Sequence, residues 1–202
     1  RGGALRAAAV GSELAMLAAG ASSDNVAAIK QAARNVVRYA DPVAWAIVSA
    51  IQAASAPHAA HVRRQGDATA LIHVTLFGPR QTMDRVRQEG ARGFASPVRF
   101  PAAAASAPAG VACMVLGLRG PSLCLTMPPD AGGELGLRLA SAWLARGAVT
   151  LCALVVTARE ASPEPCAACV LLEAATAARI TPSTAVHDRI AAMLAAVSRG
   201  QV

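Results

Sequence analysis

The chain alternates short, almost wholly apolar runs with segments of helical pattern. Three runs, residues 70–76, 149–157 and 167–172, are rich in Val, Leu and Ala. Such runs predict strands that are buried on both faces, as in a sheet covered by helices. A fourth apolar run, residues 121–127, predicts another buried strand, which Pro128 and Pro129 end.

Capping and turn residues between these runs predict the helices. Asp41 is a favourable N-cap and Pro42 fits the first helical position, so residues 43–55 are predicted to form a helix that Pro57 ends. This helix is apolar on nearly all sides, which indicates that it is buried. Further helices are predicted at residues 81–90, 108–116, 130–147 and 183–198.

Strands that alternate with helices over 202 residues indicate one layered α/β domain with a mixed sheet. We assign residues 31–202 to this domain and expect residues 1–30, which are rich in Gly and Ala, to be a poorly defined N-terminal segment. Residues 97–101 are predicted to be extended. Asp130 is predicted to cap the helix that it begins.

Composition and charge exclude several classes of function. The net charge is +7, but Lys30 is the sole lysine and the arginines are scattered, with 3% aromatic residues. Nucleic-acid binding, which favours basic stretches interleaved with aromatic residues, is therefore not expected. No apolar stretch is long enough to span a bilayer and no export signal is visible, so we expect neither a membrane partner nor a location outside the cytoplasm. A basic surface favours an acidic protein partner.

The cysteines and histidines do not form a recognisable metal or redox motif. Five cysteines are an odd number, and Cys166 and Cys169 form a single CxxC without a second pair. His58 and His61 have helical spacing but no evident third ligand. We therefore expect reduced thiols, no metal and no cofactor.

One motif carries a resemblance to a known family. Residues 117–123 spell GLRGPSL, followed by a predicted strand, a turn and a helix up to Gly147. This block resembles the approach to the nucleophile in β-ketoacyl synthases, which have the thiolase-like fold. The specific part of the resemblance covers residues 97–147, and a weaker part covers residues 32–180. It implies a layered thiolase-like half-fold.

The chain departs from that family at the reacting position. The family has a cysteine at the strand-to-helix turn, where the helix N-terminus lowers the thiol pKa and backbone N–H groups bind the oxyanion. Here Pro129, or Pro128 in a register shifted by one, occupies that position and offers neither sulfur nor N–H. The family's two histidines belong to a C-terminal half that has no counterpart in this sequence. The resemblance therefore implies a subunit that is not catalytic alone.

A ketosynthase-like protein without its cysteine resembles the chain length factor of type II polyketide synthases. That resemblance implies a heterodimer or heterotetramer with a catalytic ketosynthase, which acyl carrier protein reaches through the partner. It assigns one strand to the partner interface, namely Ser122, Leu123, Cys124, Leu125, Thr126 and Met127. It also assigns candidates that line or close an acyl tunnel, namely Val74, Thr75, Leu76, Phe77, Arg99 and Phe100.

Several alternatives remain open at this point. Phe77 and Phe100 also fit ordinary core packing, and Arg99 also fits a solvated side chain. The whole chain could instead be a degenerate half-domain with a structural role. It could also be a divergent acyltransferase in which Ser122 or Cys124 is the nucleophile.

Overall fold

The computed structural model describes residues 14–23, 25–37, 39–94, 96–158, 163–175, 181 and 183–198. Within these ranges five strands form one mixed sheet in the order β1-β5-β4-β2-β3. The strands are β1 (Leu14–Ala21), β2 (Thr69–Thr75), β3 (Ser122–Thr126), β4 (Leu151–Ala158) and β5 (Cys166–Ala174). β2 runs parallel to β3 and β4, whereas β5 runs antiparallel to β4 and β1. The predicted mixed sheet is thereby confirmed.

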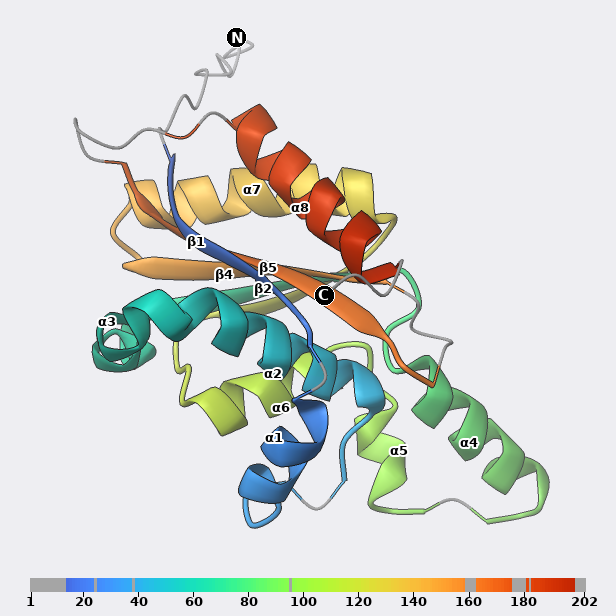
Figure 1. Ribbon diagram of the computed structural model, residues 1–202. Coiled ribbons are helices and arrows are strands. Elements are labelled where there is room, and N and C mark those ends of the chain that lie inside the picture. The colour runs from blue at the N-terminus through green and yellow to red at the C-terminus, as the bar shows by residue number, and fades with distance from the viewer. Residues whose placement is uncertain are drawn as a thin grey trace, which may run out of the picture.

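Helices cover both faces of this sheet. They are α1 (Val26–Ala33), α2 (Pro42–Ser55), α3 (Ala59–Arg64), α4 (Arg80–Ala91), α5 (Arg99–Ala102), α6 (Ala107–Leu116), α7 (Pro129–Ala145) and α8 (Ser183–Ser198), with 3₁₀ turns at Ala56–His58 and Gly66–Ala68. α7 and α8 lie on one face, α2 and α6 lie on the other, and α4 and α5 lie at one end of the molecule (Figure 1). No described helix combines the length and the apolar character that crossing a bilayer requires.

The central strands are apolar along their whole length because both of their faces are covered. All residues of β2 are buried, and alternate residues enter opposite layers. Leu71 packs in the layer of α2 and α6, whereas Ile72 and Val74 pack in the layer of α7 and α8. The continuous apolar runs in the sequence follow from this arrangement.

α2 is the buried helix that the sequence predicts. Asp41 accepts a hydrogen bond from the Val43 N–H at 2.9 Å, and Pro42 is the first helical residue. Ile47 and Val48 are fully buried against the sheet. Burial of each such side chain contributes about 1.5–3 kcal/mol to folding.

Two elements differ from the sequence predictions. β1 lies inside the N-terminal segment that was expected to be poorly defined, while residues 1–13 lie outside the described residues. A Cβ at Gly20 would lie 2.2 Å from the backbone nitrogen of Ala54, so the small residues that weaken the strand pattern allow β1 to approach α2. Residues 99–102 form α5 instead of an extended segment, because the Ser96 carbonyl accepts the Phe100 N–H at 2.9 Å.

Candidate functional site

β3 is an edge strand and not the buried strand that the sequence predicts. It pairs with β2 from Ser122 to Thr126, and no other described strand pairs with its opposite side. Ser122 and Thr126 are exposed, and the three residues between them are partly buried. The prediction of burial was wrong because an apolar run does not reveal whether a strand is central or at an edge.

The backbone groups of β3 divide into an inner and an outer set. The Leu71 N–H donates to the Pro121 carbonyl at 2.9 Å, and the Met127 N–H donates to the Thr75 carbonyl at 3.0 Å. In a parallel ladder alternate residues direct both of their backbone groups to the same neighbouring strand. The N–H and C=O groups of Ser122, Cys124 and Thr126 therefore face the open side of the sheet.

Two prolines occupy the turn that leads from β3 into α7. Pro128 precedes the helix with φ −54° and ψ 143°, and Pro129 is its first residue. Neither residue has an N–H group, so neither can donate a hydrogen bond to a negatively charged oxygen at this helix N-terminus. Asp130 does not cap α7, which corrects the sequence prediction; its exposed carboxylate lies in the first turn of the helix.

α7 lies unusually close to the sheet behind this turn. A Cβ at Gly132 would lie 2.2 Å from Cγ1 of Val74, and one at Gly136 would lie 2.6 Å from Cδ1 of Leu154. Gly132 is therefore required by the close approach of the helix to the short side chain of Val74, whereas at Gly136 the end of the Leu154 side chain would have to move. This packing fixes the position of the β3–α7 turn relative to the core.

Cys124, one of the two candidate divergent nucleophiles, contacts a buried histidine. Its sulfur lies 3.9 Å from Nδ1 of His73 and 3.3 Å from the carbonyl oxygen of Ala105. Complete burial lowers the pKa of His73 to about 3. Burial also raises the pKa of the Cys124 thiol, although a hydrogen bond with Thr126 acts in the opposite direction. Near neutral pH both groups are uncharged, so the sulfur is a thiol and not a thiolate.

The tunnel candidates fall into two groups. Val74 and Thr75 are fully buried in β2, and the Thr75 hydroxyl accepts the Gly78 N–H at 2.8 Å, which helps to form the turn after the strand. Phe77 and Phe100 are 47% and 65% exposed, and Leu76 is also exposed. Ordinary core packing, the alternative considered for the two phenylalanines, is therefore excluded for this chain.

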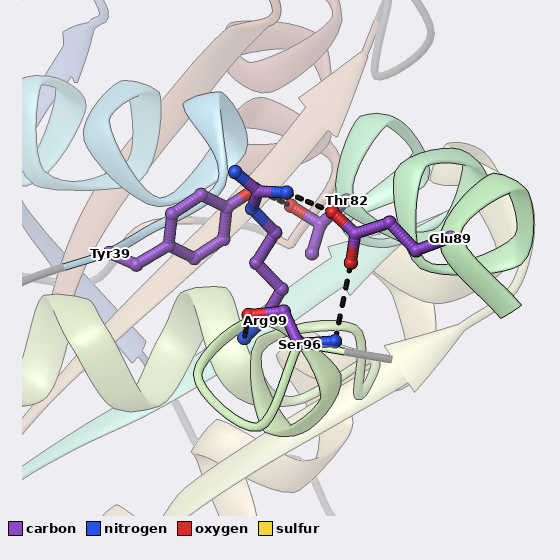
Figure 2. Close-up of polar contacts among 5 residues, drawn as sticks. All are labelled: Tyr39, Thr82, Glu89, Ser96 and Arg99. Atoms are coloured by element: carbon purple, nitrogen blue, oxygen red, sulfur yellow. Dashed lines mark hydrogen bonds and ion pairs between the residues drawn. The ribbon is translucent and has the colours of Figure 1, made fainter. Parts of the chain in front are cut away.

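Arg99 is not a freely solvated side chain. Its guanidinium forms an ion pair with Glu89 and lies 5.8 Å from the centre of the Tyr39 ring (Figure 2). The other oxygen of Glu89 accepts the Ser96 N–H at 3.3 Å. The sequence did not indicate this cluster, because its members come from separate segments and carry no shared pattern.

The described residues contain no group of three His, Cys, Asp or Glu side chains that could hold a metal ion. None of the five cysteines, all of which lie in the described part of the chain, forms a disulfide bond. A surface hollow of about 360 Å³ lies beside α1 and the start of α2, and it is lined by Lys30, Arg34, Val37, Tyr39, Ala40 and Trp45. None of the residues predicted at the interface or the tunnel lines this hollow.

No protein-family model and no curated protein matches this sequence. Solved structures do match it. The ishigamide ketosynthase/chain length factor matches with a TM-score of 0.62 at 14% identity, over 84% of this chain and 64% of that chain. A second match is a type II polyketide synthase acyl carrier protein in complex with its ketosynthase, bound to the hexaketide. Its TM-score is 0.60 at 14% identity, over 81% of this chain and 62% of that chain.

A third match is a ketosynthase in complex with its chain length factor from Xenorhabdus doucetiae. Its TM-score is 0.55 at 13% identity, over 82% of this chain and 80% of that chain. The chain thus spans less than two thirds of the first two matched chains, and a larger share of the third. At these identities the comparison establishes the fold, and it confirms the resemblance at that level: the chain has the thiolase-like α/β fold found in ketosynthases and chain length factors.

Proposed function

We propose that this chain is a non-catalytic, chain-length-factor-like subunit that pairs with an active ketosynthase. In this role it would shape the acyl tunnel during the elongation of a polyketide or a fatty-acid-like chain. Solved structures with this fold include complexes of a ketosynthase with its chain length factor and of a ketosynthase with acyl carrier protein. By analogy the assembly is a heterodimer or heterotetramer, and the carrier protein reaches it through the catalytic partner in the cytoplasm.

The chemistry of the β3–α7 turn supports a role without catalysis. Acyl transfer at a helix N-terminus needs a nucleophile and N–H donors for the developing oxyanion. Pro129 provides neither, and Pro128 gives the same result in the alternative register. Because the nucleophile and the N–H donor are both missing at this position, the turn lacks the groups that acyl transfer requires.

The open edge of β3 is the observation that carries the proposal. Its outward N–H and C=O groups at Ser122, Cys124 and Thr126 have no partner strand among the described residues. Such an edge is a template for pairing with a strand of another chain. It lies directly before the proline turn, so a partner strand bound there would bring the partner close to Phe77 at the end of β2.

Two exposed phenylalanines support the tunnel part of the proposal. Phe77 and Phe100 project from the surface, although burial of such side chains is favourable. The turn that carries Phe77 packs against the α5–α6 segment: a Cβ placed on Gly78, the next residue, would lie 3.4 Å from Cα of Ala105. In the complex, these side chains would be covered by the partner and would limit the length of the acyl chain.

Co-expression tests this function directly. A tagged chain is produced with a ketosynthase encoded near it, and the eluate is analysed by size-exclusion chromatography with light scattering. We expect a stable complex of one or two copies of each subunit, which forms carrier-protein-bound products only when both are present. A ketosynthase that elutes alone and makes the same products without the chain would contradict the proposal.

The contact between Cys124 and His73 supports one alternative, a divergent acyltransferase. A thiol beside an imidazole is an arrangement found in cysteine nucleophiles. The uncharged state of the pair argues against it, since the thiolate is the reactive form. Incubation of the isolated chain with an acyl thioester and intact-mass analysis distinguishes the two, because only the acyltransferase gains the mass of an acyl group.

A further inference from the structure

α4, α5 and the residues between them form an arm at one end of the molecule (Figure 1). Phe94, Val98 and Phe100 of this arm are 61%, 57% and 65% exposed. The arm therefore carries one of the two phenylalanines assigned to the tunnel. These three side chains do not hold the arm by core packing, and polar contacts join the arm to the rest of the chain at two places.

The first group of polar contacts joins the start of α4 to the start of α2. Asp41 is only 2% exposed, and one of its oxygens caps α2. The other oxygen accepts two hydrogen bonds from Thr82, from its N–H at 3.0 Å and from its hydroxyl at 2.6 Å. Because α2 is buried in the core, this carboxylate fixes the base of the arm.

The second group of polar contacts joins the C-terminal end of α4 to α5. Glu89 pairs with Arg99 through one oxygen and accepts the Ser96 N–H through the other (Figure 2). The Arg99 guanidinium lies over the ring of Tyr39, whose hydroxyl is 3.0 Å from Oγ1 of Thr82. Since the Thr82 hydroxyl donates to Asp41, it accepts from Tyr39. One continuous network therefore runs from the cap of α2 to the residue next to Phe100.

We propose that Arg99 and Glu89 are positioning residues that fix the orientation of Phe100 and thereby determine product length. This inference rests on the proposed function as a chain-length-factor-like subunit. Arg99 does not act by contact with an acyl chain or a carrier-protein phosphate, because its guanidinium is engaged within the chain. It acts through the backbone of α5, of which it is the first residue.

The surroundings of this ion pair distinguish it from ordinary surface pairs. The Glu89 side chain is 17% exposed and the Arg99 side chain 39%, and both make further contacts with the protein. Arg138 and Glu134 on α7 also form an ion pair, but their side chains are 74% and 61% exposed. Exposed pairs contribute little to stability or geometry. Arg138→Ala is therefore a matched control.

The test compares Arg99→Met, Glu89→Gln and the charge-swapped Glu89→Arg/Arg99→Glu chain in the complex with the ketosynthase. Product lengths are measured by mass spectrometry, and the affinity for the partner is measured in parallel. We expect both single variants to broaden the distribution towards longer products, with affinity changed less than about threefold, which is under 1 kcal/mol. The swap restores the ion pair but neither the Ser96 hydrogen bond nor the contact with the Tyr39 ring, so it should restore the wild-type distribution only in part. Arg138→Ala should not change it. Unchanged product lengths in both single variants would overturn the inference.

A second readout separates this inference from the proposed function. If the wild-type chain binds no ketosynthase, the proposed function fails. The positioning of α5 by Arg99 and Glu89 is then tested on the isolated chain by hydrogen exchange. We expect amides of residues 96–102 to exchange about tenfold faster in Glu89→Gln than in Arg138→Ala, because the arm opens locally. Equal exchange in the two variants would show that the network does not position α5.

Discussion

The sulfur of Cys124 lies 3.9 Å from Nδ1 of His73, a completely buried imidazole. The hydroxyl of Thr157 donates to the Val74 carbonyl at 3.2 Å and is 3.1 Å from Nε2 of His73. Both ring nitrogens of His73 therefore have a neighbour with which they can form a hydrogen bond. The arrangement resembles a nucleophile with its base, but burial keeps both groups uncharged.

We predict that Cys124 reacts slowly with alkylating reagents at neutral pH. Burial raises the pKa of its thiol above the ordinary value of 9.0, so the thiolate fraction at pH 7 is below that of a free cysteine. The rate of iodoacetamide labelling in a Cys113→Ser background, followed by peptide mass spectrometry, should rise with pH and have its midpoint above 9. Labelling as fast as that of free cysteine at pH 7 would contradict the prediction and favour an activated nucleophile.

We predict that His73 makes folding stability depend on pH in the acidic range. Its pKa is about 3 in the folded chain and 6.5 as the ordinary value, so the unfolded chain binds a proton that the folded chain does not. Stability from this group is complete above pH 6.5 and decreases towards pH 3, by about 1.4 kcal/mol per pH unit. Urea unfolding should therefore show a loss of about 2 kcal/mol between pH 6.5 and pH 5.

The control for this pH dependence is a variant in which the side chain at position 73 cannot titrate. His73→Gln should flatten the dependence between pH 6.5 and pH 5, whatever its effect on stability at pH 7. If the free energy of unfolding of the wild type does not change between pH 6.5 and pH 5, the pKa assigned to His73 is wrong.

The sequence predicted most of the elements but little of their environment. α2 and α8 were predicted because a cap, a first-turn proline and an apolar period are local signals. β1 was missed because its Ala and Gly residues are selected by contact with α2 and not by strand propensity. The edge position of β3 was also missed, since strand order is a property of the whole chain.

The candidate site was predicted unevenly for similar reasons. The family resemblance placed Pro129 at the strand-to-helix turn, and Pro129 is the first residue of α7. The hydrogen bonds of Asp41 to Thr82, and the ion pair of Glu89 with Arg99, join residues that have no motif in common. Contacts of this kind depend on how helices are placed on the sheet, which a single sequence does not encode in any local pattern.

We predict that a proline at position 126 prevents pairing with the ketosynthase. Thr126 is exposed, and its N–H faces away from β2, so Thr126→Pro removes an outward donor and leaves the internal ladder intact. Thr126→Val keeps the N–H and the branched side chain and is the matched control. Complex formation on size-exclusion chromatography should be lost with proline and retained with valine. Pairing of the proline variant with unchanged affinity would show that β3 is not the partner strand.

The last prediction concerns the length of the product. Phe77→Ala and Phe100→Ala should each allow longer acyl chains in the ketosynthase complex, because a growing chain gains about 0.8 kcal/mol for every further CH₂ group that it buries. Both side chains are exposed in the isolated chain, so their truncation should change its folding stability by less than about 0.5 kcal/mol. A change in product length therefore cannot be attributed to a damaged core.

Phe94→Ala is the control for this experiment, because Phe94 is as exposed as Phe100, lies on the same arm and is not assigned to the tunnel. Product lengths and melting temperatures are measured for the three variants in the same reconstituted complex. If only Phe77→Ala lengthens the product, the tunnel wall lies at the end of β2 and the arm has another role. If neither Phe77→Ala nor Phe100→Ala changes the product length while the complex still forms, the two phenylalanines do not limit the length of the acyl chain.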